Sequence, residues 1–134
     1  MAKQIKLKDQ NGDDLVIQDG ESMNIIATFS DVSSTPETLA STDILTISLT
    51  LFAGTTAINS RSAQSVLNAN NGTLASDGTL TIALGPLDSV IVGTVSAGAT
   101  ETHIARLVWT WNDGAARTGI AEYTFEVEQT ATIA

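Results

Sequence analysis

The residues best suited to recognition chemistry gather in one stretch, RLVWTWNDGAARTGIAEYTFEV, at positions 106–127. It contains both tryptophans of the chain, Trp109 and Trp111, together with Arg106 and Arg117. Aromatic rings beside a guanidinium can stack a sugar or anchor a protein interface. The alternative is that the tryptophans belong to the core of a sheet, because the same strand face continues upstream with apolar residues. That continuity favours a core position for at least one tryptophan.

The single histidine, His103, lies just upstream of this stretch. Imidazole titrates near neutrality and can act as a general base, but catalysis also needs a nucleophile or a metal. The sequence has neither a G-x-S-x-G nor an H-E-x-x-H motif, and one histidine excludes a multi-histidine metal site within one chain. We therefore expect no enzymatic activity, no catalytic residue and no cofactor.

The acidic segment DQNGDD, residues 9–14, is similar to the start of a calcium-binding loop. An EF-hand loop needs glycine at its sixth position and glutamate at its twelfth, and those positions here hold Asp14 and Gly20. The flanking residues have the pattern of strands rather than helices. A surface turn is therefore the expected structure, and no metal site is predicted.

Composition limits the classes of protein to which the chain can belong. Its 134 residues fit a single domain, residues 1–134, and its lack of cysteine excludes disulfide frameworks and zinc–thiolate sites. A net charge of −9 argues against a nucleic-acid partner, because phosphate binding needs clustered cations. The start, MAKQIKLKDQ, lacks an apolar run, so neither a signal peptide nor a membrane span is expected.

Positive charge is concentrated at the start of the chain. Lys6 and Lys8 lie within the first expected strand and Lys3 lies just before it. Residues 9–60, in contrast, contain 8 acidic residues and no lysine or arginine. Such asymmetry can steer docking onto a partner of opposite sign, although its plainer interpretation is solubility. The three lysines are therefore candidate partner-binding residues.

A second candidate contact is the segment NDGAARTG, residues 112–119, which is expected to be a loop. Its glycines indicate a mobile tip, and such tips often carry contacts. Asp113 and Arg117 are the residues expected to bind a partner there, and the alternative is a solvated turn.

Apolar periodicity predicts an all-β fold. In ILTISLTLF, residues 44–52, apolar and hydroxyl residues alternate, and a strand places Leu45, Ile47, Leu49 and Leu51 on one face. In residues 61–78 a helical turn and an irregular loop are both open, and a brief helical turn is expected at residues 86–90. The expected strands cover residues 4–8, 15–17, 22–29, 44–52, 57–60, 79–84, 103–111 and 120–128. About seven or eight short antiparallel strands are typical of a two-sheet sandwich.

The combination of SDGTLTIALGPLDS, RLVWTWNDGAARTG and EYTFEV resembles small immunoglobulin-like virion proteins of tailed bacteriophages. The upstream LKDQNGDDLVIQDGESMNIIATF is similar to N-terminal modules of phage tail and baseplate proteins. The likeness covers about residues 23–127 and includes no invariant motif, so no functional residue is transferred from it. The chain departs from such proteins in having no fibre-like or receptor-binding extension.

This resemblance implies an immunoglobulin-like sandwich with a non-enzymatic structural role in a virion, as capsid decoration or in the neck or tail. The implied partners are phage capsid, neck or tail proteins, bound in many symmetric copies made in the host cytoplasm. Residues 1–8, as an edge strand or arm, and the tail 129–134 are expected to reach a neighbour. The alternative function is a carbohydrate- or host-surface-binding module.

Overall fold

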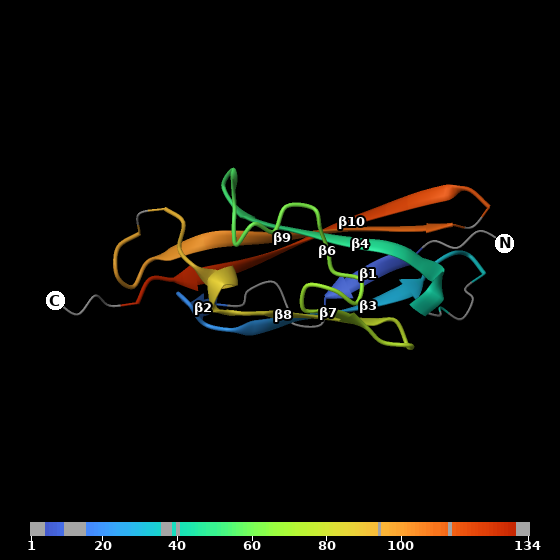
Figure 1. Ribbon diagram of the computed structural model, residues 1–134, viewed down its shortest axis with the longest axis horizontal. Helices are drawn as coiled ribbons and strands as arrows, with labels where there is room; N and C mark the ends of the chain where they lie inside the picture. The colour runs from blue at the N-terminus through green and yellow to red at the C-terminus, as the bar shows by residue number, and fades with distance from the viewer. Residues whose placement is uncertain are drawn as a thin grey trace.

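A computed structural model describes residues 5–9, 16–35, 39, 41–93, 95–112 and 114–130, which form two β-sheets lying face to face (Figure 1). One sheet has the order β1 (Ile5–Asp9), β3 (Met23–Asp31), β8 (Thr79–Leu84) and β7 (Gly72–Leu74). The other has the order β2 (Val16–Gln18), β10 (Ala116–Glu128), β9 (Thr100–Asn112), β4 (Ile44–Ala53) and β5 (Thr56–Ala57), with β6 (Gln64–Ser65) also paired to β4. Two 3₁₀ turns, η1 (Ser41–Asp43) and η2 (Pro86–Ser89), complete the described elements. Neither has the length to span a bilayer.

This strand order is that of an immunoglobulin-like sandwich. In immunoglobulin lettering, the first sheet reads A-B-E-D and the second A′-G-F-C-C′, so the predicted all-β, immunoglobulin-like fold is confirmed. Two details differ from expectation. The described residues form ten strands rather than seven or eight, because several are only two or three residues long. One pair, β2 with β10, is parallel rather than antiparallel.

The core lies between the sheets and is filled by alternate residues of the long strands. From His103 to Trp111 every second residue of β9 is buried, and the same alternation holds in β8. The buried residues on these two strands are His103, Ala105, Leu107, Trp109, Trp111, Leu80, Ile82 and Leu84. Antibody domains join strands B and F by a disulfide, whereas this cysteine-free chain brings β3 and β9 together through an edge-to-face pair of Phe29 and Trp109, with centroids 5.3 Å apart.

The expected orientation of Leu45 is wrong. A β-bulge between Ile44 and Thr46 shifts the register of β4 against β9, so Ile44 is buried and Leu45 is 54% exposed. Because one extra residue reverses which face the preceding side chains occupy, the period of two predicted here breaks at the start of the strand. Beyond the bulge, Ile47 and Leu49 face the core as expected.

The expected loop at residues 112–119 is mostly strand. Strand β9 continues to Asn112 and β10 begins at Ala116, so Arg117 pairs with Trp111 instead of occupying a loop tip. The turn is made by Gly114, whose φ of 106° suits glycine, and its N–H donates to Asn112 Oδ1 over 2.8 Å.

Gly119 has a packing role rather than a turn role. The buried indole of Trp109 occupies the space that a Cβ at Gly119 would need. From there its Nε1 donates a hydrogen bond of 3.2 Å to the backbone carbonyl of Ile5 in β1. The absence of a side chain at Gly119 therefore allows one tryptophan to connect the two sheets.

Residues 61–78, for which the pattern left two structures open, contain no helical turn. They form β6, β7 and irregular segments in which asparagines adopt positive φ, at Asn68, Asn70 and Asn71. Asparagine tolerates this left-handed backbone because its short polar side chain bonds locally. One such contact is that of Asn68 Oδ1, which accepts the Leu74 N–H over 2.9 Å.

A buried ion pair joins this irregular region to η2. Arg61 Nε lies 2.6 Å from Asp88 Oδ1 and Nη2 lies 3.2 Å from Oδ2, with both side chains at most 5% exposed. Asn59 Nδ2 and the Gly85 N–H donate to the same carboxylate over 2.9 and 2.8 Å. The remaining Arg61 donor, Nη1, contacts Gln64 and the Asn70 carbonyl. Every oxygen of Asp88 is thus hydrogen-bonded, as a buried charge requires.

Candidate interaction surface

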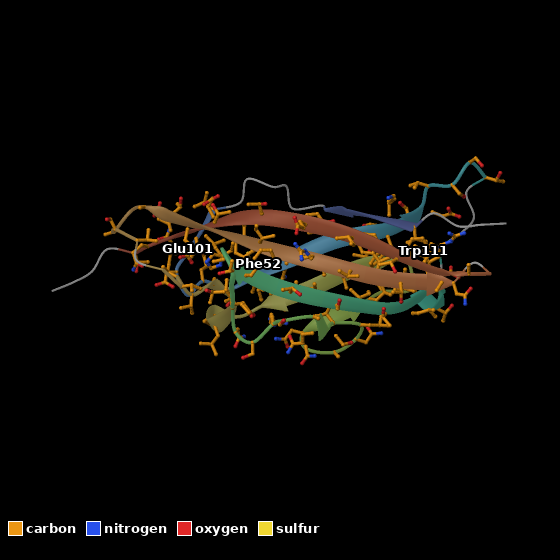
Figure 2. The ribbon with its side chains drawn as sticks, turned by 90° about the horizontal axis from the view of Figure 1, so that it is seen from above. Phe52, Glu101 and Trp111 are labelled. Atoms are coloured by element: carbon orange, nitrogen blue, oxygen red, sulfur yellow. The ribbon has the colours of Figure 1, made fainter. Side chains whose placement is uncertain are left out.

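Both tryptophans lie in the core, which removes the sugar-stacking role considered for them. Trp109 is 1% and Trp111 2% exposed, so neither ring presents a face to solvent. Figure 2 shows Trp111 towards the end of the sheet opposite to Glu101 and Phe52. The core interpretation is confirmed for the pair.

His103 is also buried, and among the described residues its polar partner is Glu101. Its Nε2 lies 2.7 Å from Glu101 Oε1, and its ring packs edge-to-face on Phe125. Glu101 Oε1 and Oε2 also accept the N–H groups of Val92 and Gly93, over 2.9 and 2.8 Å. Burial raises the pKa of Glu101, but the two backbone N–H groups and His103 outweigh it and hold that pKa below its ordinary value. This arrangement fixes the segment after η2 to β9.

Replacing Glu101 with alanine is expected to free the Val92 and Gly93 amides, which lose a charged acceptor. Their hydrogen exchange should accelerate about tenfold or more, since a hydrogen bond to a carboxylate contributes more than a neutral one. Exchange followed by NMR measures this effect. Glu122→Ala, an exposed glutamate on the neighbouring strand, is the matched control, and equal acceleration in both variants would contradict the assignment.

The outer face of the six-stranded sheet carries a shallow hollow of about 240 Å³. We call it the Arg106 hollow, and its lining residues are Thr50, Phe52, Thr55, Ala57, Ser62 and Arg106. The guanidinium of Arg106 lies 5.4 Å from the centre of the Phe52 ring, and Nη2 lies 2.6 Å from Glu122 Oε2. This exposed ion pair contributes little stability, but it holds a cation beside an aromatic ring and three hydroxyl groups. Figure 2 views this face, with Phe52 labelled.

Three of the five predicted partner-binding residues are described in the structure, and they lie on two strands, β1 and β10. Lys3 and Asp113 lie outside the described residues, as does most of the acidic segment 9–14. Lys6 is exposed on the edge strand β1, Lys8 lies on the same strand, and Arg117 is exposed near the start of β10. Across the described residues, no group of three or more histidine, cysteine, aspartate or glutamate side chains is arranged to hold a metal ion.

Sequence patterns missed the Arg106 hollow and the Arg61–Asp88 pair. The alternation that buries Leu51 places Phe52 outward, but no pattern within β4 indicates that Arg106 of another strand lies beside its ring. Ser62 and Thr55 reach the hollow only because short strands pair back onto β4. Asp88 three residues after Gly85 was the one local signal, since it accepts the Gly85 N–H at the start of η2.

No protein-family model matches this chain, and no curated protein sequence shows significant similarity to it. Among solved structures, it is similar to murine CRIg, with 9% identity, a TM-score of 0.43, and coverage of 96% of this chain and 99% of that one. It is also similar to BcpA, the major pilin subunit of Bacillus cereus, with 13% identity and a TM-score of 0.41. That match covers 92% of this chain and 40% of the pilin. The fold assignment rests on the strand order described above.

Proposed function

We propose that the chain is a non-enzymatic structural protein of a bacteriophage virion, present in many symmetric copies that bind capsid, neck or tail proteins. The observation that carries this proposal is the segregation of charge. All three lysines lie within residues 3–8, the chain as a whole carries −9, and Lys6 is exposed on an edge strand. Such a strand can dock on an acidic face of a neighbouring protein, and many weak contacts repeated by symmetry give firm attachment. The link to a virion is supported by the resemblance of the strand and turn residues to phage proteins.

Two of the three arginines already have a carboxylate partner. Arg61 is buried against Asp88, and Arg106 is paired with Glu122. Lys6, in contrast, has an exposed side chain on a strand whose Ile5 is fully buried and thereby anchors it to the core. The strand is therefore held in place by the sandwich while the charge of Lys6 faces outward.

A second candidate function is a carbohydrate- or host-surface-binding module. The Arg106 hollow favours it, because an aromatic ring, a guanidinium and several hydroxyls are groups that bind sugar hydroxyls and rings. This role would lie on the sheet face rather than at the tryptophans.

Sedimentation with purified phage particles tests the first proposal. Reversing charge at Lys3, Lys6 and Lys8 to glutamate should abolish co-sedimentation. The Lys6 substitution should leave the fold intact, because that side chain is exposed. Truncation of residues 1–8 is a poorer test, since it removes the buried Ile5 and the acceptor of Trp109.

The matched control is Arg106→Ala, which should leave particle binding unchanged. The first proposal would be wrong if purified particles lack the protein, or if they bind the lysine variant as tightly as the wild type. NMR shifts around Thr50 and Phe52 on titration with glycans, lost in Arg106→Ala, would favour the second.

A further inference from the structure

The Arg106–Glu122 ion pair holds a hydrogen-bond donor and an acceptor side by side at the Arg106 hollow. Both polar contacts of the guanidinium, from Nε over 2.7 Å and from Nη2 over 2.6 Å, converge on one oxygen, Glu122 Oε2. Among the described residues no other group bonds to this pair, so Arg106 Nη1 can still donate and Glu122 Oε1 can still accept. The two side chains are 47% and 44% exposed, which leaves both groups within reach of a ligand.

The Phe52 ring supplies an apolar surface next to this donor and acceptor. The guanidinium carbon of Arg106 lies 5.4 Å from the ring centre, and Phe52 is partly exposed where it lines the hollow. Three hydroxyl groups line the same hollow, those of Thr50, Thr55 and Ser62. Thr50 Oγ1 accepts the Ala63 N–H over 2.9 Å, which fixes the oxygen in place and leaves its hydrogen as a donor. The hollow therefore combines one apolar surface with several polar groups.

The charges at the hollow cancel within the protein. Glu122 balances Arg106, and the other residues that line the hollow in the described part of the chain are uncharged. A carboxylate or phosphate ligand would have to compete with Glu122 for the guanidinium, and both Glu122 and the net charge of −9 would repel it. A neutral ligand meets no such repulsion and can use the donor and the acceptor together.

We infer that the Arg106 hollow binds one ring of a neutral sugar through two neighbouring hydroxyl groups. One hydroxyl oxygen accepts from Arg106 Nη1, the adjacent hydroxyl donates to Glu122 Oε1, and the apolar face of the sugar ring lies on Phe52. The volume of about 240 Å³ is below the roughly 300–1,000 Å³ of pockets for drug-sized ligands, which limits the occupant to a single ring. This inference rests on the second candidate function and specifies its class of sugar.

NMR titration of the full chain tests the class of sugar. The neutral probes are the methyl glycosides of glucose, galactose and mannose, and at least one should give saturable shifts of the Thr50, Phe52 and Arg106 amides. The methyl glycoside of glucuronic acid is the matched acidic probe for the glucoside. It should bind at least about fivefold more weakly than the best neutral glycoside, because its carboxylate meets that of Glu122. Fully O-methylated glycosides, which keep the ring but cannot donate, should give no saturable shift.

Two variants test the assigned roles of the ion pair. Arg106→Met should weaken binding of the neutral glycoside about tenfold or more, since a hydrogen bond from a charged donor is lost. Arg117→Met is the matched control, because Arg117 is an exposed arginine on β10 that does not line the hollow, and its affinity should be unchanged. Glu122→Gln keeps an oxygen acceptor but removes the charge, so it should strengthen glucuronide binding about fivefold or more while the neutral glycoside still binds.

The outcomes separate this inference from the function on which it rests. Tighter binding of the glucuronide than of every neutral glycoside by the wild type would overturn the inference, whereas the second candidate function would stand. If no glycoside, neutral or acidic, gave a saturable shift at the hollow, both would be wrong. Unchanged affinity of Arg106→Met for the neutral glycoside, or a loss equal to that of Arg117→Met, would also overturn the inference.

Discussion

Replacing Arg61 with methionine is expected to lower the free energy of unfolding by about 3–5 kcal/mol, the usual cost of removing one partner from a buried ion pair. Methionine fills much of the same space but leaves the Asp88 carboxylate buried with only Asn59 and the Gly85 N–H as donors. Urea unfolding followed by tryptophan fluorescence measures the loss.

Arg106→Met is the matched control, because Arg106 also pairs with a carboxylate but is 47% exposed. Arg106→Met should lower the free energy of unfolding by at most about 1 kcal/mol, which is the range for exposed ion pairs. The double variant Arg61→Met with Asp88→Leu should regain part of the stability, since both charges are then absent. Equal losses for Arg61→Met and Arg106→Met would show that burial does not govern the first pair.

The contribution of the Arg61–Asp88 pair to stability should depend on pH. Burial raises the pKa of Asp88, but the hydrogen bonds from Arg61, Asn59 and Gly85 together with the Arg61 charge lower it below its ordinary value. A carboxyl with a depressed folded-state pKa contributes stability in full above its unfolded-state pKa of about 4, and loses it as the pH falls through the lower folded-state pKa. The difference in stability between wild type and Arg61→Met should therefore shrink from neutral pH to about pH 2–3.

Gly119→Ala is expected to cost about 2–4 kcal/mol, although alanine is ordinarily the better residue in a folded chain. The new Cβ would occupy the place of the Trp109 indole, which is held by its Phe29 contact and its bond to Ile5. To avoid this clash the Trp109 ring must move, and it then loses packing contacts and the hydrogen bond that connects the two sheets. The same unfolding measurement applies, with the tryptophan emission of the folded state as a second readout.

Gly85→Ala provides the comparison, because nothing lies within 4 Å of a Cβ at that position and φ is −90°. It should be neutral or slightly stabilising, since alanine reduces the entropy of the unfolded chain. If Gly119→Ala were equally tolerated, the packing role assigned to Gly119 would be wrong.

The period of two predicted most of the core because the alternation of a strand is local. The inward residues of β8 and β9 follow from counting along the chain, and they include His103 and both tryptophans. The same counting failed at Leu45, where a bulge adds one residue, and at Gly119, which resembles a loop residue until its partner across the strand pair is known. The effect of a bulge or of a missing Cβ depends on contacts with the neighbouring strand, and that strand is distant in sequence.

The candidate surfaces were less accessible to sequence reasoning than the fold. The residues that line the Arg106 hollow come from β4, β9 and the segments around β5, so no spacing of residues along the chain predicts it.

By itself, the amino-acid sequence determined that this chain forms an all-β sandwich, that its tryptophan strand has one apolar face, and that its lysines lie at the start. These features depend on composition and on residues that are close together in the sequence. Only the tertiary structure decided that Arg61 is buried against Asp88, that Trp109 reaches Ile5 past Gly119, and that Arg106 lies beside Phe52. Each of these joins residues far apart in the chain, and such pairings arise only when the two sheets have packed.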